Sequence, residues 1–421
     1  MRETVVVVGG GAAGLMAAGR AAEMGAPVLL LEKLDRVGRK LQISGKGRCN
    51  VTHSGGVPEL IANFASGGRF LYSSVSAFDN QALVQFLADL GVATKVERGG
   101  RVFPASDDAG RVVQALLGYC RRNGVAVRCR APVGGLLVEA GRIAGASLLS
   151  GERVPAGALV VTTGGLSYPG TGSTGDGYRL AEAVGHTVVP PVPSLVPLVV
   201  EEGWARDLQG LTLRNVRVRS QADGRVLGEE FGEMLFTHFG VSGPIILTLS
   251  REIARHLAAG GGPVRLRLDL KPALSPAQLD ERLQRDFARS SRRRFRHALD
   301  ELLPRSLAQV IVARSGIDAE LPLHQVTRPA RLGIGETIKD LGLTVTRTMP
   351  AALAIVTAGG VTTSEIDPRT MESKLIKGLY FAGEVVDYDA RTGGYNLQAA
   401  FSTGRSAGEA AAARVRGADK G

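Results

Sequence analysis

Short, continuous apolar runs occur in the first and last parts of the chain. Such runs predict buried parallel strands, because parallel strands are covered by helices on both faces. The predicted strands are Thr4–Val8, Val28–Leu31, Ala158–Thr163, Leu353–Ala358 and Leu379–Ala382. Between residues 80 and 130 the pattern changes repeatedly between helical periodicity and short strands. These parts of the chain are therefore expected to form an α/β domain.

A different pattern occupies the middle of the chain. From residue 195 to 270 polar and apolar positions alternate, most clearly over 211–219 and 264–270, which predicts half-buried antiparallel strands. Helical periodicity follows over residues 276–340. Four prolines between Pro190 and Pro197 interrupt regular structure and predict a crossing between domains.

These patterns predict that one domain is inserted into another. We expect residues 1–192 and 346–421 to form the α/β domain, and residues 193–345 to form the insert. Within the insert, residues 195–270 are predicted to be rich in strands and residues 276–340 to be helical. The last helix is predicted to begin near Leu397.

The first strand is followed by Gly9-Gly10-Gly11-Ala12-Ala13-Gly14, which fits the pattern G-x-G-x-x-G. The same spacing recurs at Gly170–Gly175, and a chain with 56 glycines produces such matches by chance. Context separates the two copies. The first has a strand before it and an alanine-rich helix, Ala12–Met24, after it, whereas the second has no strand immediately before it. Only the first copy therefore predicts a nucleotide site.

The glycines of the first copy have geometric roles in a dinucleotide site. Gly9 permits the tight turn, Gly11 lets a pyrophosphate approach the backbone, and Gly14 lets the helix pack closely. The diphosphate is expected at the helix N-terminus, where free N–H groups and the dipole favour negative charge. Glu32 follows the second strand, where its carboxylate can accept hydrogen bonds from ribose hydroxyls. An acid at this position favours FAD or NAD over NADP.

A second glycine-rich region lies near the C-terminus. A short strand is predicted to deliver Gly383 and Glu384, and Gly393-Gly394 then opens a helix. Backbone N–H groups at this helix start would contact the far end of a long cofactor, which fits FAD better than NAD. The alternative is a plain turn capped by the two glycines.

The chain resembles the YhiN/BaiN-type family of bacterial flavoproteins, which is also labelled aminoacetone oxidase family or NAD(P)/FAD-dependent oxidoreductase. The motifs that carry the resemblance span nearly the full length and include VVVVGGGAAGLMAA, GRKLQISGKGRCNVTH, VVTTGGLSYPGTGSTGDGY, GEMLFTHFGVSGPIIL and GLYFAGEVVDYDARTGGYNLQAAFSTG. The resemblance implies an α/β fold with a glutathione-reductase-like Rossmann FAD domain, interrupted by an insert with a β-rich part and a helical part. Lys46 and His53 depart from the glycine and asparagine that are more usual in the family.

The motifs and the resemblance together give a set of expected FAD contacts. Val133 is implied as a backbone contact near the adenine, and Arg39 and Lys40 as contacts from the loop after the second strand. The full set is Gly9, Gly11, Ala12, Ala13, Gly14, Glu32, Lys33, Arg39, Lys40, Val133, Gly383, Glu384, Gly394, Asn396 and Leu397.

Three residues are candidates for catalysis. Arg48 and Cys49 lie in SGKGRCN, a glycine-rich turn that is expected near the flavin ring, where a cation would favour the reduced, anionic flavin. For Cys49 a small buried filler is an equal alternative to a redox thiol. His238, in LFTHFGVSG of the insert, could donate a proton to substrate, or it could be a structural histidine.

Composition limits the class of protein. With 421 residues, 44% hydrophobic and 22% charged, the chain reads as a soluble globular protein. No apolar stretch is long enough to cross a membrane, and the N-terminal apolar run belongs to the glycine motif rather than to a signal peptide, so a cytoplasmic location is expected. Three cysteines are too few for a disulfide framework or a zinc site, and no metal is expected.

The chain carries a formal net charge of +11, which would help it attract nucleic acid, anionic cofactors or acidic substrates. The densest basic run, Arg289–His297, is expected to lie inside a helical stretch, 276–314. A solvated helix face is the favoured interpretation of this run, and an RNA-contacting patch is the alternative, because basic residues alone give only sequence-blind attraction.

The sequence therefore predicts an FAD-dependent oxidoreductase that takes hydride from NAD(P)H, its transient donor, and reduces a small organic substrate. The BaiN resemblance suggests an unsaturated ketone. The competing functions are a flavin-dependent amine oxidase, an FAD-dependent RNA-modifying enzyme and a non-catalytic FAD-containing protein. A nucleic-acid partner is possible but not favoured, no membrane partner is expected, and the sequence does not indicate an oligomeric state.

Overall fold

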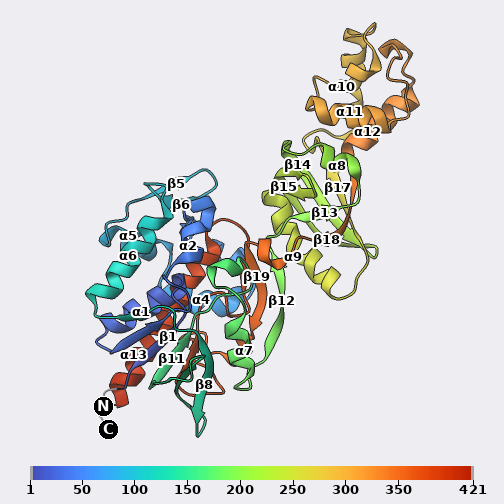
Figure 1. Cartoon of the computed structure of the whole chain (residues 1–421). Coiled ribbons are helices and arrows are strands. Elements are labelled where there is room, and N and C mark those ends of the chain that lie inside the picture. The colour runs from blue at the N-terminus through green and yellow to red at the C-terminus, as the bar shows by residue number, and fades with distance from the viewer. Residues whose placement is uncertain (1–2, 419–421) are drawn as a thin grey trace. The chain divides into compact units, whose positions relative to one another are not determined.

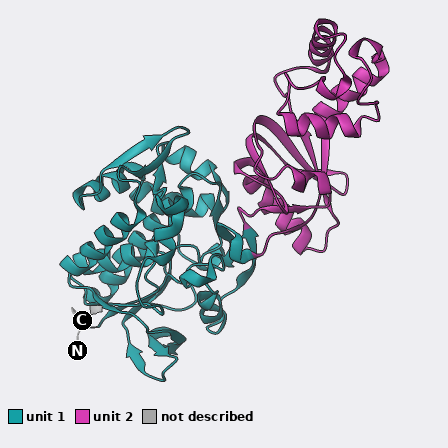
Figure 2. Cartoon of the chain, turned by 45° about the horizontal axis from the view of Figure 1, so that its top comes forward, with its two compact units in different colours: residues 1–193, 351–421 teal, residues 194–350 magenta. Residues whose placement is uncertain are grey.

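The computed structural model describes residues 3–418, which divide into two compact units (Figures 1 and 2). Unit 1 comprises residues 1–193 and 351–421, and unit 2 comprises residues 194–350. Unit 2 is thus an insertion in the sequence of unit 1. Each unit has its own hydrophobic core.

The central sheet of unit 1 has the strand order β20-β11-β1-β2-β7, and every neighbouring pair in it is parallel. Four of its strands, β20, β11, β1 and β2, are continuous apolar runs because helices cover the sheet, and the four valines of β1 are 0–5% exposed. The sheet thus confirms the predicted Rossmann-type α/β class. The strands of unit 1 are β1 (Val5–Val8), β2 (Val28–Leu31), β3 (Thr52–His53), β4 (Phe64–Ser66), β5 (Thr94–Glu97), β6 (Arg101–Pro104), β7 (Ala126–Arg128), β8 (Val133–Glu139), β9 (Arg142–Leu148), β10 (Arg153–Pro155), β11 (Ala158–Val161), β12 (Val188–Ser194), β19 (Val356–Val361), β20 (Leu379–Phe381) and β21 (Asp389–Ala390).

The helices of unit 1 pack around this sheet and the smaller sheets β10-β9-β8, β3-β6-β5, β12-β19 and β21-β4. A 3-10 turn, η1 (Ser44–Gly47), follows α2, and η2 (Pro169–Thr171) precedes α7. The α-helices are α1 (Ala12–Glu23), α2 (Arg39–Ile43), α3 (Val57–Ala62), α4 (Gly68–Ala77), α5 (Asn80–Asp89), α6 (Ala109–Arg122), α7 (Asp176–Glu182) and α13 (Tyr395–Ala418).

Helices α1 and α13 touch backbone to backbone, although they lie at opposite ends of the sequence. A Cβ added at Gly404 would lie 2.9 Å from Ala13 Cα, and one at Gly408 would lie 2.9 Å from Ala17 Cα. Only glycine therefore permits this close packing. The contact positions the start of α1, which carries the first glycine motif, against α13.

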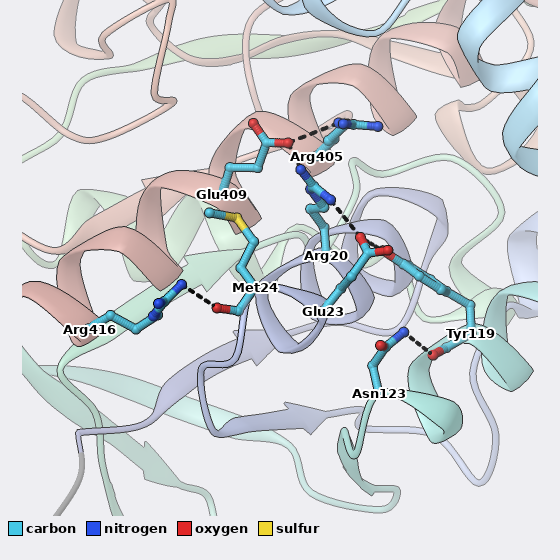
Figure 3. Close-up of polar contacts among 8 residues, drawn as sticks. All are labelled: Arg20, Glu23, Met24, Tyr119, Asn123, Arg405, Glu409 and Arg416. Carbon is cyan, nitrogen blue, oxygen red and sulfur yellow. Dashed lines mark hydrogen bonds and ion pairs between the residues drawn. The ribbon is translucent and has the colours of Figure 1, made fainter.

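A polar network holds the same helices together farther along, where Figure 3 shows the side chains of α1, α6 and α13 meeting. Arg20 of α1 pairs with Glu23 at 2.6 Å and with Glu409 of α13 at 2.7 Å. The hydroxyl of Tyr119 of α6 donates to Glu23 Oε2 at 2.7 Å, and Arg405 also pairs with Glu409. The network ties the three helices together at a distance from the glycine motif.

Two local predictions for unit 1 were wrong. The proline-rich segment does not interrupt regular structure, because residues 188–194 form β12, which pairs with β19 in a two-stranded sheet. Proline is compatible with such an edge position, where its missing N–H is not needed by a neighbouring strand. The strand predicted at Leu353–Ala358 begins later, at Val356, because residues 351–353 form the 3-10 turn η5 (Ala351–Leu353).

Unit 2 contains a closed barrel with the strand order β13-β16-β15-β14-β17-β18, as the predicted alternation indicated. In β17, for example, Val264, Leu266 and Leu268 are fully buried while the residues between them are exposed. The strands are β13 (Leu198–Val200), β14 (Thr212–Ala222), β15 (Arg225–Thr237), β16 (Gly240–Ser242), β17 (Val264–Asp269) and β18 (Leu341–Thr348). The α-helices are α8 (Gly203–Asp207), α9 (Pro244–Ala258), α10 (Pro276–Arg289), α11 (Arg305–Arg314) and α12 (Arg328–Lys339).

The basic run of unit 2 does not lie inside a helix, which corrects the prediction. Helix α10 ends at Arg289, and the chain continues through a turn into the 3-10 turn η3 (Phe295–His297). The buried Phe295 donates its N–H to the Leu321 carbonyl at 2.9 Å, and Leu323 donates to the Arg293 carbonyl at 3.0 Å. These tertiary hydrogen bonds replace the helical ones and place the arginines on a turn.

Candidate functional site

Three loops of unit 1 that carry expected site residues, those after β1, β2 and β20, leave the same edge of the central sheet as the loop after β11. Because β1, β2, β11 and β20 are parallel, their carboxyl ends lie together. The chain order reverses direction at β1, since β2 lies on one side of it and β11 on the other. Ligands of open α/β sheets bind at such a switch point, outside the carboxyl ends of the strands.

The turn after β1 leaves an open helix start at the switch point. Gly9 has φ +104°, and a Cβ there would lie 2.7 Å from the Thr162 carbonyl oxygen. A Cβ at Gly14 would lie 2.6 Å from Thr162 Oγ1, whereas a Cβ at Gly11 would meet nothing within 4 Å. Gly11 is the N-cap of α1 and provides no side-chain cap. The N–H groups of Ala12 and Ala13 therefore begin the helix beside open space, as an anion site requires.

Glu32 holds this turn to the loop after β2. Its Oε2 accepts the N–H of Gly10 at 2.9 Å, and its Oε1 accepts the N–H of Leu34 at 2.8 Å. Each carboxylate oxygen keeps a further lone pair, so the group can also accept hydroxyl donors. The backbone of Ala131 donates to the Glu32 carbonyl at 2.9 Å, which fixes the chain just before Val133 next to this loop.

The cations after β2 reach across to the loop after β11. Lys33 Nζ lies 2.5 Å from Asp176 Oδ2, and Lys40 Nζ pairs with Glu384 and donates to Ser167 Oγ at 2.6 Å. Arg39 pairs with Asp35 at 2.9 Å. All three side chains therefore have acidic protein partners in this structure.

Gly383 and Glu384 stand after β20, beside α1. Gly383 has φ +78°, and a Cβ there would lie 2.8 Å from the Cβ of Ala13. The N–H of Gly383 donates to Thr403 Oγ1 at 3.1 Å, and Glu384 Oε1 accepts the N–H of Thr357 at 2.9 Å. The structure thus brings this loop to the first glycine motif.

The start of α13 is packed against β3. Gly394 has φ +102°, and a Cβ there would lie 2.8 Å from Thr52 Cα. The Asn396 side chain accepts the N–H of Ala390 at 3.0 Å and donates to its carbonyl at 3.1 Å, which fixes the turn. Leu397 lies in the first turn and is partly buried.

Arg48 and Cys49 lie just after η1, in surroundings that differ from the expectation. The Arg48 guanidinium pairs with Glu97 and with Asp107 and lies 4.2 Å from the centre of the Phe103 ring. Its charge is therefore paired with two carboxylates.

Cys49 is fully buried, and burial raises the pKa of its thiol to about 12, with the Ser44 hydrogen bond opposing the shift. A thiolate is therefore not available near neutral pH. Its burial favours the small buried filler, the alternative that the sequence left open for Cys49.

Three buried polar atoms without a hydrogen-bond partner lie on the segments that follow β2 and β11 along the chain. Within residues 3–418, Arg39 Nε, Asn50 Oδ1 and Thr163 Oγ1 are buried and unpartnered. Buried polar groups normally find partners, so such atoms point to a missing one. Together with the open space at Gly11 they fit a polar cofactor such as FAD. The described residues contain no cluster of three or more His, Cys, Asp or Glu that could hold a metal ion.

His238 belongs to unit 2 and is exposed in the turn between β15 and β16. Its ring lies 4.9 Å from that of Phe239. Arg48 and Cys49 belong to unit 1. No helix in the described part of the chain is long and apolar enough to span a membrane.

Sequence reasoning missed several residues of this edge. It did not find Ser167 and Thr357, which bind Lys40 and Glu384, or the pairing of Lys33 with Asp176. It also missed the stacking of His53 on Tyr395, with ring centres 4.9 Å apart. No local signal in the sequence indicated the partners of Lys33.

Known proteins resemble this chain over nearly its whole length. The model of the family described as HI0933-like protein Rossmann domain matches residues 3–410. The chain is 32% identical over 413 residues to the 3-dehydro-bile acid delta(4,6)-reductase of Clostridium scindens, covering 97% of this chain and 98% of that protein. It is 32% identical over 406 residues to the ribosomal RNA dihydrouridine synthase of Escherichia coli, covering 96% of each.

A solved structure shares the fold. The 3-ketosteroid delta1-dehydrogenase from Sterolibacterium denitrificans matches with a TM-score of 0.54 at 15% identity, covering 98% of this chain and 100% of that one. The resemblance that the sequence motifs indicated is confirmed by the family match. The chain belongs to the HI0933-like protein Rossmann domain family.

Proposed function

We propose that this flavin-dependent oxidoreductase reduces a carbon–carbon double bond conjugated with a carbonyl group, in a small organic substrate and at the expense of NAD(P)H. The observation that carries the proposal is the chemistry common to the names of two full-length relatives. A 3-dehydro-bile acid delta(4,6)-reductase acts on double bonds conjugated with a ketone. A dihydrouridine synthase acts on the uracil ring, whose C5–C6 double bond is conjugated with the C4 carbonyl.

The chain's own residues would bind and orient the cofactor. The open N-terminus of α1 at Gly11 would receive the diphosphate, and Glu32 would accept the ribose hydroxyls. The N-terminus of α13 at Gly394 would contact the end of FAD that lies farther from the adenine. FAD, when bound, supplies the hydride transfer, so the protein's task is to position substrate and tune the site.

Saturating a conjugated double bond consumes a proton as well as a hydride. We propose His238 as the proton donor, because it is exposed and can be reprotonated from solvent. Arg48, held by Glu97 and Asp107, would act by fixing the loop before β3.

The test is an anaerobic titration of the purified protein with NADH and then NADPH, followed by the visible flavin absorbance. Bleaching of the flavin, and its return when a 3-oxo-4,6-diene steroid or cyclohexenone is added, would support the proposal. Bleaching by amines alone would support an amine oxidase instead. Flavin that neither nicotinamide reduces would overturn the proposed donor.

A uracil base in RNA is the second candidate substrate, and a specific observation favours it. In the turn after α10, Arg292 and Arg293 are exposed, and within residues 3–418 their side chains have no ion pair. Together with the net charge of +11, such arginines favour binding to phosphates. Return of the bleached absorbance on adding ribosomal RNA, but not on adding the enones, would establish this alternative.

A further inference from the structure

Two lysines from the loop after β2 bind the segment that follows β11. Lys33 Nζ donates to Thr174 Oγ1 at 2.5 Å and pairs with Asp176 at 2.5 Å. Lys40 Nζ donates to Ser167 Oγ at 2.6 Å and pairs with Glu384. Both lysines therefore hold the same segment, residues 167–176, which contains the second G-x-G-x-x-G sequence.

The topology determines what these bridges cross. In the sheet order β20-β11-β1-β2-β7, β1 lies between β2 and β11. Strands two places apart are separated by about 10 Å. Each bridge therefore joins the segment after β2 to the segment after β11, and these two strands flank β1, whose carboxyl end carries the turn at Gly9. The diphosphate is expected at the same edge of the sheet.

The second glycine motif allows this closure. Gly172 has φ +101°, and a Cβ there would lie 3.1 Å from Leu34 Cδ1 and 3.4 Å from Lys33 Cε. A larger residue would hold the segment away from the loop after β2. The motif thus serves close packing between two loops, which accounts for glycines that form no separate nucleotide site.

The bridges are more than surface ion pairs. The side chains of Lys33 and Asp176 are 25% and 21% exposed, and those of Lys40 and Glu384 are 25% and 19% exposed. Burial alone would raise the pKa of Asp176, yet Lys33 and Arg179 hold it below its usual value. Each lysine has three N–H donors and uses two of them here, so one donor is left for a phosphate oxygen.

We propose that residues 167–176 form a strap that retains FAD, closed over its diphosphate by Lys33 and Lys40. This inference rests on the proposed use of FAD. The inference assigns Asp176 a positioning role. The Asp176 carboxylate is negative, yet it helps to retain an anionic cofactor because it holds Lys33 and thereby keeps the strap closed.

The test compares Lys33→Met, Asp176→Asn and the double variant with the native protein. FAD release is followed by the rise of free-flavin fluorescence after dilution of the loaded protein. The matched control is Lys339→Met, because Lys339 forms a similar pair with Asp269 at 2.5 Å, in unit 2. Hydrogen exchange of residues 168–176 without FAD provides a second readout.

The strap predicts that each single variant releases FAD about fivefold faster. The double variant should release it no faster than the singles, because both changes open the same bridge. Residues 168–176 should exchange faster in Lys33→Met, and Lys339→Met should change neither measurement.

The direction in which Asp176→Asn changes the rate of FAD release distinguishes the strap from a direct contact between Lys33 and the phosphate. If Lys33 served only as a phosphate ligand, removing the neighbouring carboxylate would slow FAD release, and that result would overturn the strap. Effects of the two single changes that multiply in the double variant would also overturn it. A protein that binds FAD but whose flavin is not reduced by NAD(P)H would contradict the proposed function alone, because the rates of FAD release would still test the strap. A native protein that binds no FAD would overturn both.

Discussion

The contrast between Gly11 and Gly14 provides a test that separates cofactor binding from folding. Gly11 has φ −81° and ψ −166°, an extended conformation that alanine adopts without strain. A Cβ at Gly11 would meet nothing within 4 Å. We therefore expect Gly11→Ala to change the free energy of unfolding without FAD by less than about 1 kcal/mol.

The same methyl group would project into the space in which the diphosphate is expected. Displacing a phosphate from one N–H group costs about 1.5–3 kcal/mol, since hydrogen bonds to charged groups have this magnitude. The FAD dissociation constant should therefore rise roughly ten- to hundredfold. Isothermal titration of FAD into the protein freed of flavin measures this change.

Gly14→Ala should behave in the opposite way without FAD. Its Cβ would lie 2.6 Å from Thr162 Oγ1 and still closer to the Gly9 carbonyl oxygen, so α1 must move. Overpacking of this kind costs about 1–3 kcal/mol, which lowers Tm by roughly 2–12 °C. Unchanged FAD affinity in Gly11→Ala, or an undiminished Tm in Gly14→Ala, would refute this account of the glycine motif.

Further predictions concern three residues of unit 1. Glu32→Ala should weaken FAD retention and lower Tm, because it leaves the N–H groups of Gly10 and Leu34 unpaired. Flavin fluorescence measures the retention of FAD, and thermal melts measure Tm. Full retention of FAD in a folded variant would contradict the ribose role of Glu32. Cys49 should resist iodoacetamide at pH 8 until the protein is unfolded, because its thiol is buried and its pKa is raised to about 12. Peptide mass spectrometry measures the labelling. Rapid labelling of the native protein would contradict the burial of Cys49. Burial lowers the pKa of His186, which is bound to Glu365 and Ser373, so the folded state binds fewer protons than the unfolded state. The free energy of unfolding should therefore be independent of His186 titration well above pH 6.5 and should decrease as the pH falls below that value, by at most about 1.4 kcal/mol per pH unit. Urea denaturation of the native protein and of His186→Gln measures this dependence. It should be shallower in the variant.

Local sequence signals were sufficient for the elements that carry the cofactor motif. The strand at Val28–Leu31 was predicted with the bounds it has, because its apolar run is enclosed by Pro27 and a charged loop. The same local signals misled at the prolines of β12 and at the arginines after α10. At both places the structure is decided by pairing with a distant segment, β19 in one case and residues 321–323 in the other.

The glycines of the candidate site could be predicted because their roles are local and geometric. The partners of the cations could not. Lys33 was expected from the sequence to contact FAD, but Asp176 lies 143 positions away along the chain, and only the sheet order brings the two together. Similarly, nothing in the composition of SGKGRCN indicates that Glu97 and Asp107 balance the charge of Arg48.

The insertion of unit 2 imposes an order on biosynthesis. A ribosome makes β1, α1, β2 and β11 first, then the whole of unit 2, and only afterwards β20 and α13. Until α13 is made, the face of α1 that packs against Gly404 and Gly408 is therefore uncovered in the nascent chain. Glu384 and Gly394 are synthesised after every strand of the barrel, so the proposed FAD site would be completed only then. Binding of FAD at this site would be a late step, and a chain arrested within unit 2 would expose the apolar helix α1 to chaperones.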